Sequence, residues 1–185
     1  MRNLLTALLA TGALLGAAGS ASAAAVGTNF VVSATVLKTC SVAASNLGFP
    51  NYTPGAGPQT ATSTIGVNCT KGTAFTVALD KGTTAGGTVA QRLMAQGGGG
   101  AGTLQYNLCT TAVTAAAACN GATLWGDGNG GTITQGGVGA GMGAGNVQNL
   151  TVNGGLPDNA FNQGAAVAAA GSSLYSDTVS VTVTY

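Results

Sequence analysis

The chain has 185 residues, of which five are Lys or Arg and four are Asp, with no Glu and no His. So few cations cannot form the basic face that phosphate neutralisation requires, which excludes a nucleic-acid-binding protein. A near-neutral surface rich in Thr, Ser, Asn, Gln and Gly instead favours self-association over electrostatic repulsion, as in a polymer.

Residues 1–23 have the pattern of a secretory signal peptide. Arg2 supplies the positive charge, residues 4–18 are apolar and uncharged, and residues 21–23 read Ala-Ser-Ala, an A-x-A cleavage motif. We expect cleavage between residues 23 and 25. The alternative, an uncleaved membrane anchor, is disfavoured because a spanning helix needs about 20 apolar residues and the apolar stretch of residues 4–18 is shorter. The sequence therefore predicts an exported protein with no membrane segment in its mature form.

The first strand expected after the signal peptide covers residues 28–38. Phe30, Val32, Ala34 and Val36 alternate with their neighbours and would share one face of an extended strand. The opposite face is mixed rather than polar.

Four cysteines in an exported chain predict two disulfides, with three pairings possible. Cys109 and Cys119 enclose a short Ala- and Thr-rich segment, which favours a local bridge. Cys40 and Cys69 would then join two early strands. A metal site is disfavoured by the absence of His and of a C-x-x-C motif, so we expect neither metal nor cofactor.

Short alternating runs predict further strands between residues 60 and 110. Gly and Pro make residues 45–59 a loop, and Lys71-Gly72 a turn. Residues 112–118 are the one helix-like candidate. The alternating apolar sets are Ile65/Val67/Cys69, Phe75/Val77/Leu79 and Leu104/Tyr106/Leu108.

The last part of the chain combines glycine with two strand patterns. Residues 126–145 are a long loop or a pair of weak strands, and residues 147–152 form a strand that Gly154-Gly155 ends. The clearest strand spans residues 176–185, with Val179, Val181, Val183 and Tyr185 on one face. Seven or eight short strands with no convincing helix predict an antiparallel β-sandwich.

Catalytic equipment is missing from the sequence. Without His the usual general base near neutral pH is absent, and no Ser/His/Asp or Cys/His arrangement can be assembled. The four carboxylates, Asp80, Asp127, Asp158 and Asp177, stand in contexts typical of turns and strand starts. We therefore expect no enzymatic activity.

An alternating strand directly after the signal peptide, together with a final strand that reaches Tyr185, suggests exchange of strands between copies. A sheet edge left open beside the final strand invites pairing with another chain. Because each copy would both give and receive a strand, the contact would not close, and a filament would form. The alternative is that residues 28–38 pair within their own sheet.

Several motifs give the chain a resemblance to the spore coat U domain family, which covers nearly all of the mature chain. The motifs are Thr39-Cys40-Ser41-Val42, Leu47-Gly48-Phe49, Val67-Asn68-Cys69-Thr70-Lys71-Gly72, Phe75-Thr76-Val77-Ala78-Leu79-Asp80-Lys81-Gly82, Arg92-Leu93-Met94, Leu104-Gln105-Tyr106-Asn107-Leu108, Leu124-Trp125-Gly126-Asp127-Gly128 and residues 175–185. A segment inserted from Cys109 to Gly121, with its own cysteine pair, departs from the family pattern.

The resemblance implies a role as a subunit of an archaic, Csu-like chaperone–usher pilus that supports attachment and biofilm formation. The implied fold is an incomplete immunoglobulin-like sandwich, residues 39–185, completed by a donor strand from residues 24–38 of another copy. Val179, Val181, Val183 and Tyr185 would then border the acceptor groove. The implied partners are identical subunits, a periplasmic chaperone and an outer-membrane usher, and the implied location is a cell-surface fibre. The Cys40–Cys69 pairing also follows the family pattern.

Two alternatives stay open. One is a secreted coat or matrix protein of the same family that does not polymerise by strand donation. The other is a tip adhesin, for which a domain of this size leaves little room for a separate receptor-binding part.

Overall fold

The computed structural model describes residues 23–113, 119, 122–166, 171 and 173–185. The predicted signal peptide and most of residues 112–118 therefore lie outside the described residues. The chain divides into two compact units, Met1–Thr35 and Val36–Tyr185. Residues 23–35 of the first unit are extended, with exposed side chains and no strand pairing. No helix among the described residues is long and apolar enough to cross a bilayer.

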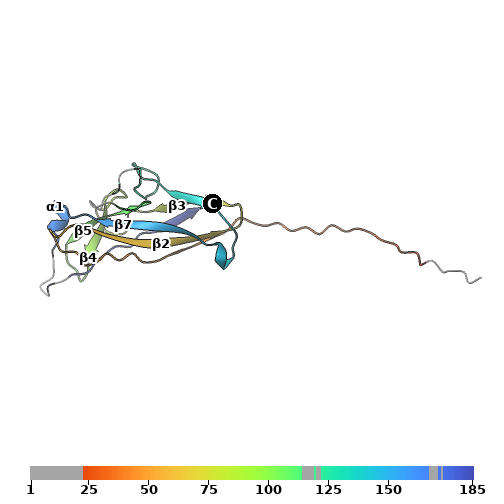
Figure 1. Ribbon diagram of the computed structural model, residues 1–185, viewed down its shortest axis with the longest axis horizontal. Helices are drawn as coiled ribbons and strands as arrows, with labels where there is room; N and C mark the ends of the chain where they lie inside the picture. The colour runs from red at the N-terminus through yellow and green to blue at the C-terminus, as the bar shows by residue number, and fades with distance from the viewer. Residues whose placement is uncertain (1–22, 114–118, 120–121, 167–170, 172) are drawn as a thin grey trace, which may run out of the picture. The chain divides into compact units, whose positions relative to one another are not determined.

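The second unit is all-β and antiparallel, as the sequence predicted (Figure 1). One sheet has six strands in the order β1-β2-β7-β5-β4-β8 and the other has three in the order β6-β3-β9. The strands are β1 (Cys40–Ala44), β2 (Gln59–Cys69), β3 (Ala74–Leu79), β4 (Arg92–Gln96), β5 (Thr103–Cys109), β6 (Gln135–Val138), β7 (Gln148–Leu156), β8 (Tyr175–Ser176) and β9 (Val181–Thr184). Two single-turn helices, η1 (Ala144–Asn146) and α1 (Ala160–Gln163), complete the described elements.

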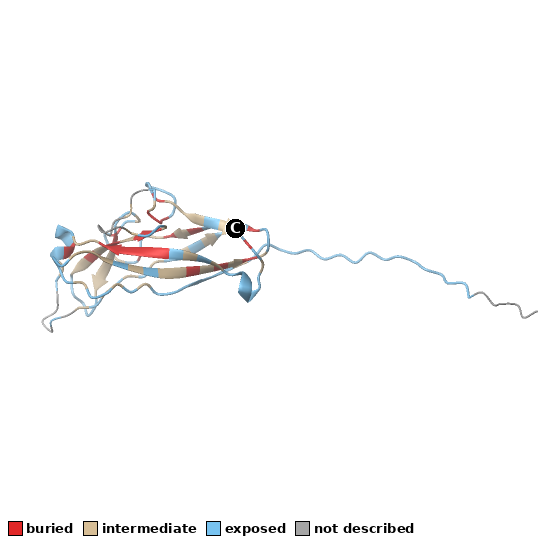
Figure 2. Ribbon diagram, in the orientation of Figure 1, coloured by how far each residue is buried: buried red, intermediate tan, exposed pale blue. Residues whose placement is uncertain are grey.

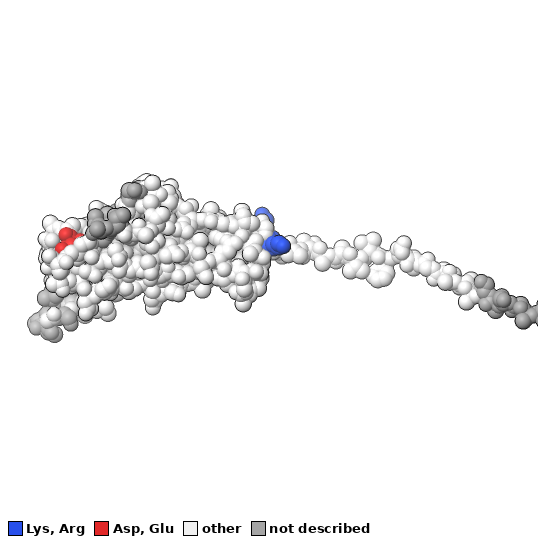
Figure 3. All heavy atoms as spheres, in the orientation of Figure 1, with Lys and Arg blue, Asp and Glu red and all other residues white. Residues whose placement is uncertain are grey.

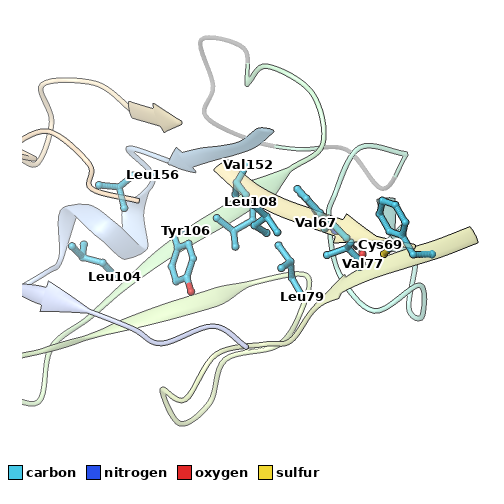
Figure 4. Packing of buried hydrophobic residues seen from close by; sticks show 12 residues of the cluster. Val67, Cys69, Val77, Leu79, Leu104, Tyr106, Leu108, Val152 and Leu156 are labelled. Carbon is cyan, nitrogen blue, oxygen red and sulfur yellow. Dashed lines mark hydrogen bonds between the residues drawn. The ribbon is translucent and has the colours of Figure 1, made fainter. Parts of the chain in front are cut away.

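The core lies between the two sheets and is built from the alternating positions of β2, β3 and β5 (Figure 2, Figure 4). Successive strand residues point to opposite faces, so apolar residues at every second position share one face, and that face turns toward the core. The three alternating sets expected from the sequence are all buried. Trp125 joins them, fully buried, and its indole N–H donates to the Val77 carbonyl at 3.0 Å.

The strand predicted over residues 176–185 is interrupted, which corrects the sequence expectation. Its start, β8, pairs with β4, and its end, β9, pairs with β3 in the other sheet. Asp80 explains the switch: its N–H donates to the Ser180 carbonyl at 3.1 Å, and its carboxylate accepts the Ser180 N–H at 2.9 Å. These bonds draw the chain onto β3 immediately before β9 begins.

The prediction that Gly154-Gly155 ends a strand was wrong. Strand β7 continues to Leu156, with Gly154 and Gly155 paired to β2 on one side and β5 on the other. A Cβ at position 154 would lie 2.9 Å from the Leu47 methyl groups and 3.0 Å from the Phe49 ring. The glycine therefore marks a close approach in a central strand and not a turn.

The glycine-rich residues 126–145 contain one short strand, β6, which pairs with β3, followed by η1. Helix α1 was not expected. It is capped by Asn159, whose side chain accepts the Asn162 N–H at 2.9 Å. Asn162 is itself buried and accepts the Gln105 N–H at 2.7 Å, so one polar side chain fastens this turn to β5.

Candidate functional site: an open apolar groove

An open groove of about 1000 Å³ runs along one side of the second unit, and residues of the core line it. Protein interiors hold few voids larger than a water molecule, so a space of this size is one that the fold leaves to be filled. Its apolar lining comes from the segment before β2 and from five strands: Leu47, Phe49, Ile65, Leu79, Met94, Leu104, Tyr106, Leu108, Val152 and Leu156.

Strand β9 and the residues before it border this groove. Among the described residues β9 pairs with β3 alone, and β1, at the edge of the other sheet, pairs with β2 alone. Val179 and Val181, both predicted, line the groove. Val183 packs against the core without lining the groove, and Tyr185 is 55% exposed. The unpaired edge of β9 thus carries partly buried valines that border the groove.

The floor of the groove is the core itself. Leu104, Tyr106 and Leu108 project from β5, and all three are at least nine-tenths buried while still lining the space. Phe49 packs edge-on against Tyr106, with ring centroids 6.5 Å apart. An apolar side chain entering the groove would therefore contact the core directly.

The loop that carries Tyr52 lines part of the groove, and an aspartate holds this loop in place. The Tyr52 hydroxyl donates to Asp158 at 2.6 Å, and the N–H groups of Gly55 and Gly57 donate to the same carboxylate at 3.0 and 2.8 Å. These hydrogen bonds, the Tyr52 bond first, lower the pKa of Asp158 below its ordinary value. Burial and the same bond raise the pKa of Tyr52.

A second aspartate fixes the wall between β8 and β9. Asp177 accepts hydrogen bonds from the Tyr106 hydroxyl at 2.6 Å and from the Thr83 and Thr84 N–H groups at 2.9 and 3.0 Å. Burial opposes ionisation of Asp177, yet the bonds from Tyr106 and Thr84 outweigh it and lower its pKa. The chemistry at this wall is structural, because each carboxylate oxygen is occupied by donors of the same domain.

The predicted donor residues are exposed and belong to no strand of the described structure. Phe30, Val32 and Val36 are 84%, 81% and 80% exposed, and Ala34 is exposed as well. Large apolar side chains this exposed in consecutive alternate positions are typical of a segment that awaits a partner.

Both disulfides are formed, and neither lines the groove. Cys40 and Cys69 are directly opposite in the β1–β2 pair, with Cα atoms 4.1 Å apart, so the bridge fastens the edge strand β1 to the sheet. Cys109 and Cys119 join across 5.7 Å between Cα atoms. The predicted pairings are thus the ones in the structure.

Sequence reasoning named one wall of the groove and missed most of its lining. Leu47, Phe49 and Tyr52 lie in a loop, where strand periodicity carries no information about the direction of a side chain. Three large apolar residues within a Gly- and Pro-rich loop were the available signal, because solvent-exposed loops seldom carry them.

Comparison with known proteins identifies a family and shows similarity to a solved structure. Residues 27–182 match the family described as Spore Coat Protein U domain. No curated protein matches the chain. A chain in the crystal structure of the CsuC–CsuE chaperone–tip adhesion subunit pre-assembly complex, from archaic chaperone–usher Csu pili of Acinetobacter baumannii, is similar, with 22% identity and a TM-score of 0.49. The similarity covers 82% of the present chain and 40% of that chain, so the present chain spans about two fifths of its length.

Proposed function

The chain belongs to the Spore Coat Protein U domain family, and from this premise we propose that it is a structural subunit of an extracellular fibre assembled by strand donation. The family is one of structural proteins, and the chain is not an enzyme. The proposed donor is the segment from residue 24 to residue 38, and the proposed acceptor is the groove beside β9 of another copy.

The open groove is the observation that carries this proposal. A self-contained sandwich would cover its core, whereas here Ile65, Tyr106 and Leu108 line a space of about 1000 Å³. The free edge of β9 supplies the backbone groups with which an added strand would pair. An extended segment with apolar side chains at alternate positions has the shape and chemistry that this space accepts.

The donor segment supplies those side chains. Phe30, Val32 and Val36 are each at least 80% exposed in the single chain. Burial of a large apolar side chain contributes about 1.5–3 kcal/mol, so three of them, with Ala34 between, account for a strongly favourable association. The backbone ladder along β9 would add to it.

Assembly follows from the same geometry. Each copy has one donor and one groove, so the contact is head-to-tail and propagates. A subunit whose groove is empty has an unfilled apolar space and a free strand edge, which favours a periplasmic chaperone that covers the groove until an outer-membrane usher brings the next subunit. The exported chain would thus pass through the periplasm to a cell-surface fibre that supports attachment and biofilm formation.

Deletion of residues 27–36 tests the proposal. The shortened chain should be exported and should form both disulfides, yet it should remain a monomer because it has no strand to donate. Mixed with the full-length chain, it should still accept a strand and should end growing fibres. Negative-stain microscopy and denaturant-resistant ladders on gels report both results.

A matched pair of variants tests whether fibre formation requires the apolar face of the donor segment and not only the presence of the segment. Phe30→Asp with Val32→Asp should abolish fibres, because both charges would enter the apolar groove. Ser33→Asp with Thr35→Asp places the same charges on the opposite face and should leave fibres intact. Denaturant-resistant fibres from the deletion chain would contradict strand donation and would favour a coat or matrix protein.

A further inference from the structure

The second unit carries its charges unevenly: on the face shown in Figure 3, basic side chains lie at one end and acidic side chains toward the other. The Thr39 N–H donates to the Thr70 hydroxyl at 3.1 Å, and the Thr70 N–H donates to the Thr39 carbonyl at 3.0 Å. Their neighbours Lys38 and Lys71 are therefore side by side, and both are exposed. We call this end, where β1 begins and β2 ends, the lysine pole.

The carboxylates lie away from the lysine pole. Asp158 lies two residues after Leu156, which pairs with Gln59 at the start of β2. The lysine pole lies at the opposite end of β2, where the strand ends at Cys69. At about 3.3 Å per residue, the eleven residues of β2 separate the two ends by roughly 33 Å. The remaining carboxylates surround the far end of β3: Asp80, Asp127 and Asp177. Against these four carboxylates stand Lys81 and the buried Arg92, so the side-chain charge is 2 − 4 = −2 there and +2 at the lysine pole.

The short connection between donor and domain forces the lysine pole against a neighbour. This step rests on the strand donation proposed above. Four residue steps separate Val36, the last apolar residue on the donor face, from Cys40, the first residue of β1. Fully extended, they span about 14 Å at most. When Val36 fills the groove of another copy, the lysine pole of the donating copy therefore lies beside one end of that groove.

The two ends of the groove differ in charge. Toward the lysine pole the lining stops at Ala44, Ile65 and Val181. Beyond it stand the acceptor's own Lys38 and Lys71, which would repel the incoming pair. The other end is bordered by Tyr52 and by Asp158, whose three hydrogen-bond donors are neutral groups. That carboxylate therefore keeps its negative charge without a cation of its own.

We propose that the lysine pole of each subunit docks against the Asp158 end of the next, with Lys38 and Lys71 facing the Asp158 carboxylate. The partner is a second copy of this chain. Opposite charge across such a contact accelerates encounter and selects orientation more than it adds affinity. The contact would thus guide the donor into the groove from the correct end.

The test is the rate at which the full-length mature chain assembles, followed by light scattering at low and at high salt. Lys38→Glu with Lys71→Glu should slow assembly about tenfold at low salt, and because the reversed charges would repel the Asp158 end, added salt should now speed assembly instead of slowing it. The matched control is Lys81→Glu, an exposed lysine outside the lysine pole, which should change the rate by less than about twofold. Thermal unfolding of each monomer verifies that the variants are folded.

A charge swap makes the test independent of folding defects. Ala160→Lys with Gln163→Lys puts two cations beside Asp158 on exposed positions of α1, and alone it should slow assembly. Combined with K38E/K71E, it should restore the rate. If K38E/K71E fails to fold, Lys38→Gln with Lys71→Gln, which removes the charges without reversing them, should slow assembly at low salt and make the rate independent of salt.

Two results separate this contact from the proposed function. If K38E/K71E assembles at the unmodified rate with its salt dependence intact, while Phe30→Asp with Val32→Asp forms no fibres, strand donation stands and the charge contact is wrong. If the Phe30 and Val32 variant still forms fibres, strand donation itself fails, and this inference falls with it.

Discussion

The hydroxyl of Tyr106 donates a hydrogen bond of 2.6 Å to the carboxylate of Asp177, and this bond joins β5 to the segment that crosses from β8 to β9. Tyr106 belongs to the buried face of β5, and Asp177 begins the segment that leaves β8 for β9. The same carboxylate accepts the N–H groups of Thr83 and Thr84. The wall of the groove beside β9 is therefore held by a polar contact that originates in the core.

Tyr106→Phe removes that hydroxyl and leaves the ring. We expect the free energy of unfolding to fall by about 1.5–3 kcal/mol, the usual contribution of a hydrogen bond to a charged group. Urea unfolding of the monomer measures the loss. Tyr185→Phe, on an exposed tyrosine, is the control and should be close to neutral. An unchanged urea midpoint for the Tyr106 variant would mean that the contact contributes nothing.

Asp177→Asn should change how stability depends on pH. The pKa of Asp177 is lower in the folded chain than its unfolded value of about 3.9, so the folded state favours the ionised form. Its contribution is present above the unfolded pKa and disappears as the pH falls through the folded pKa. The variant should thus be less stable than the natural chain at neutral pH, and the difference should shrink below about pH 4. Urea midpoints across this range are the measurement, and a difference independent of pH would contradict the assignment.

Gly82→Ala should destabilise the domain more than Gly72→Ala. Both glycines have positive φ, +84° and +81°, so each alanine carries a backbone penalty of about 1–2 kcal/mol. At position 72 the new Cβ meets open space, whereas at position 82 it would overlap the Asp177 carboxylate. Displacing that carboxylate adds the loss of its hydrogen bonds, at least about 2 kcal/mol. Equal losses in thermal unfolding would show that Asp177 moves away freely.

Arg92 is the most buried charge of the domain and should tolerate little change. Its guanidinium donates to the backbone carbonyls of Asp80, Leu79, Val89 and Trp125 at 2.8–3.2 Å. Arg92→Met would leave these buried carbonyls without a donor, and we expect a loss of about 3–5 kcal/mol.

Arg92→Lys is the informative companion because it retains the charge without the planar fork of donors. We expect it to recover part of the loss and not all of it. The control is Lys81→Met at an exposed position, with a change within about 0.5 kcal/mol. Equal unfolding midpoints for Arg92→Met and the natural chain would show that the carbonyls find other partners.

The prediction of the core succeeded where side chains alternate within a single strand. Val67, Val77 and Leu108 are buried because a strand with one apolar face has one way to cover it. The prediction failed where long-range bonds override local pattern. Asp80 diverts residues 177–180 between sheets, and Leu47 and Phe49 make Gly154 a packing requirement in place of a turn.

By itself, the sequence determined an antiparallel all-β domain with its buried faces, a two-disulfide framework and a chain without catalytic groups, since each of these depends on residue type and short-range order. Tertiary structure alone decided that the core stays open beside β9 and which loop residues line that opening. It also decided that two lysines 33 positions apart gather at one end of the domain. An unfilled groove and a charged end arise from residues far apart in the chain, and only the folded arrangement brings those residues together.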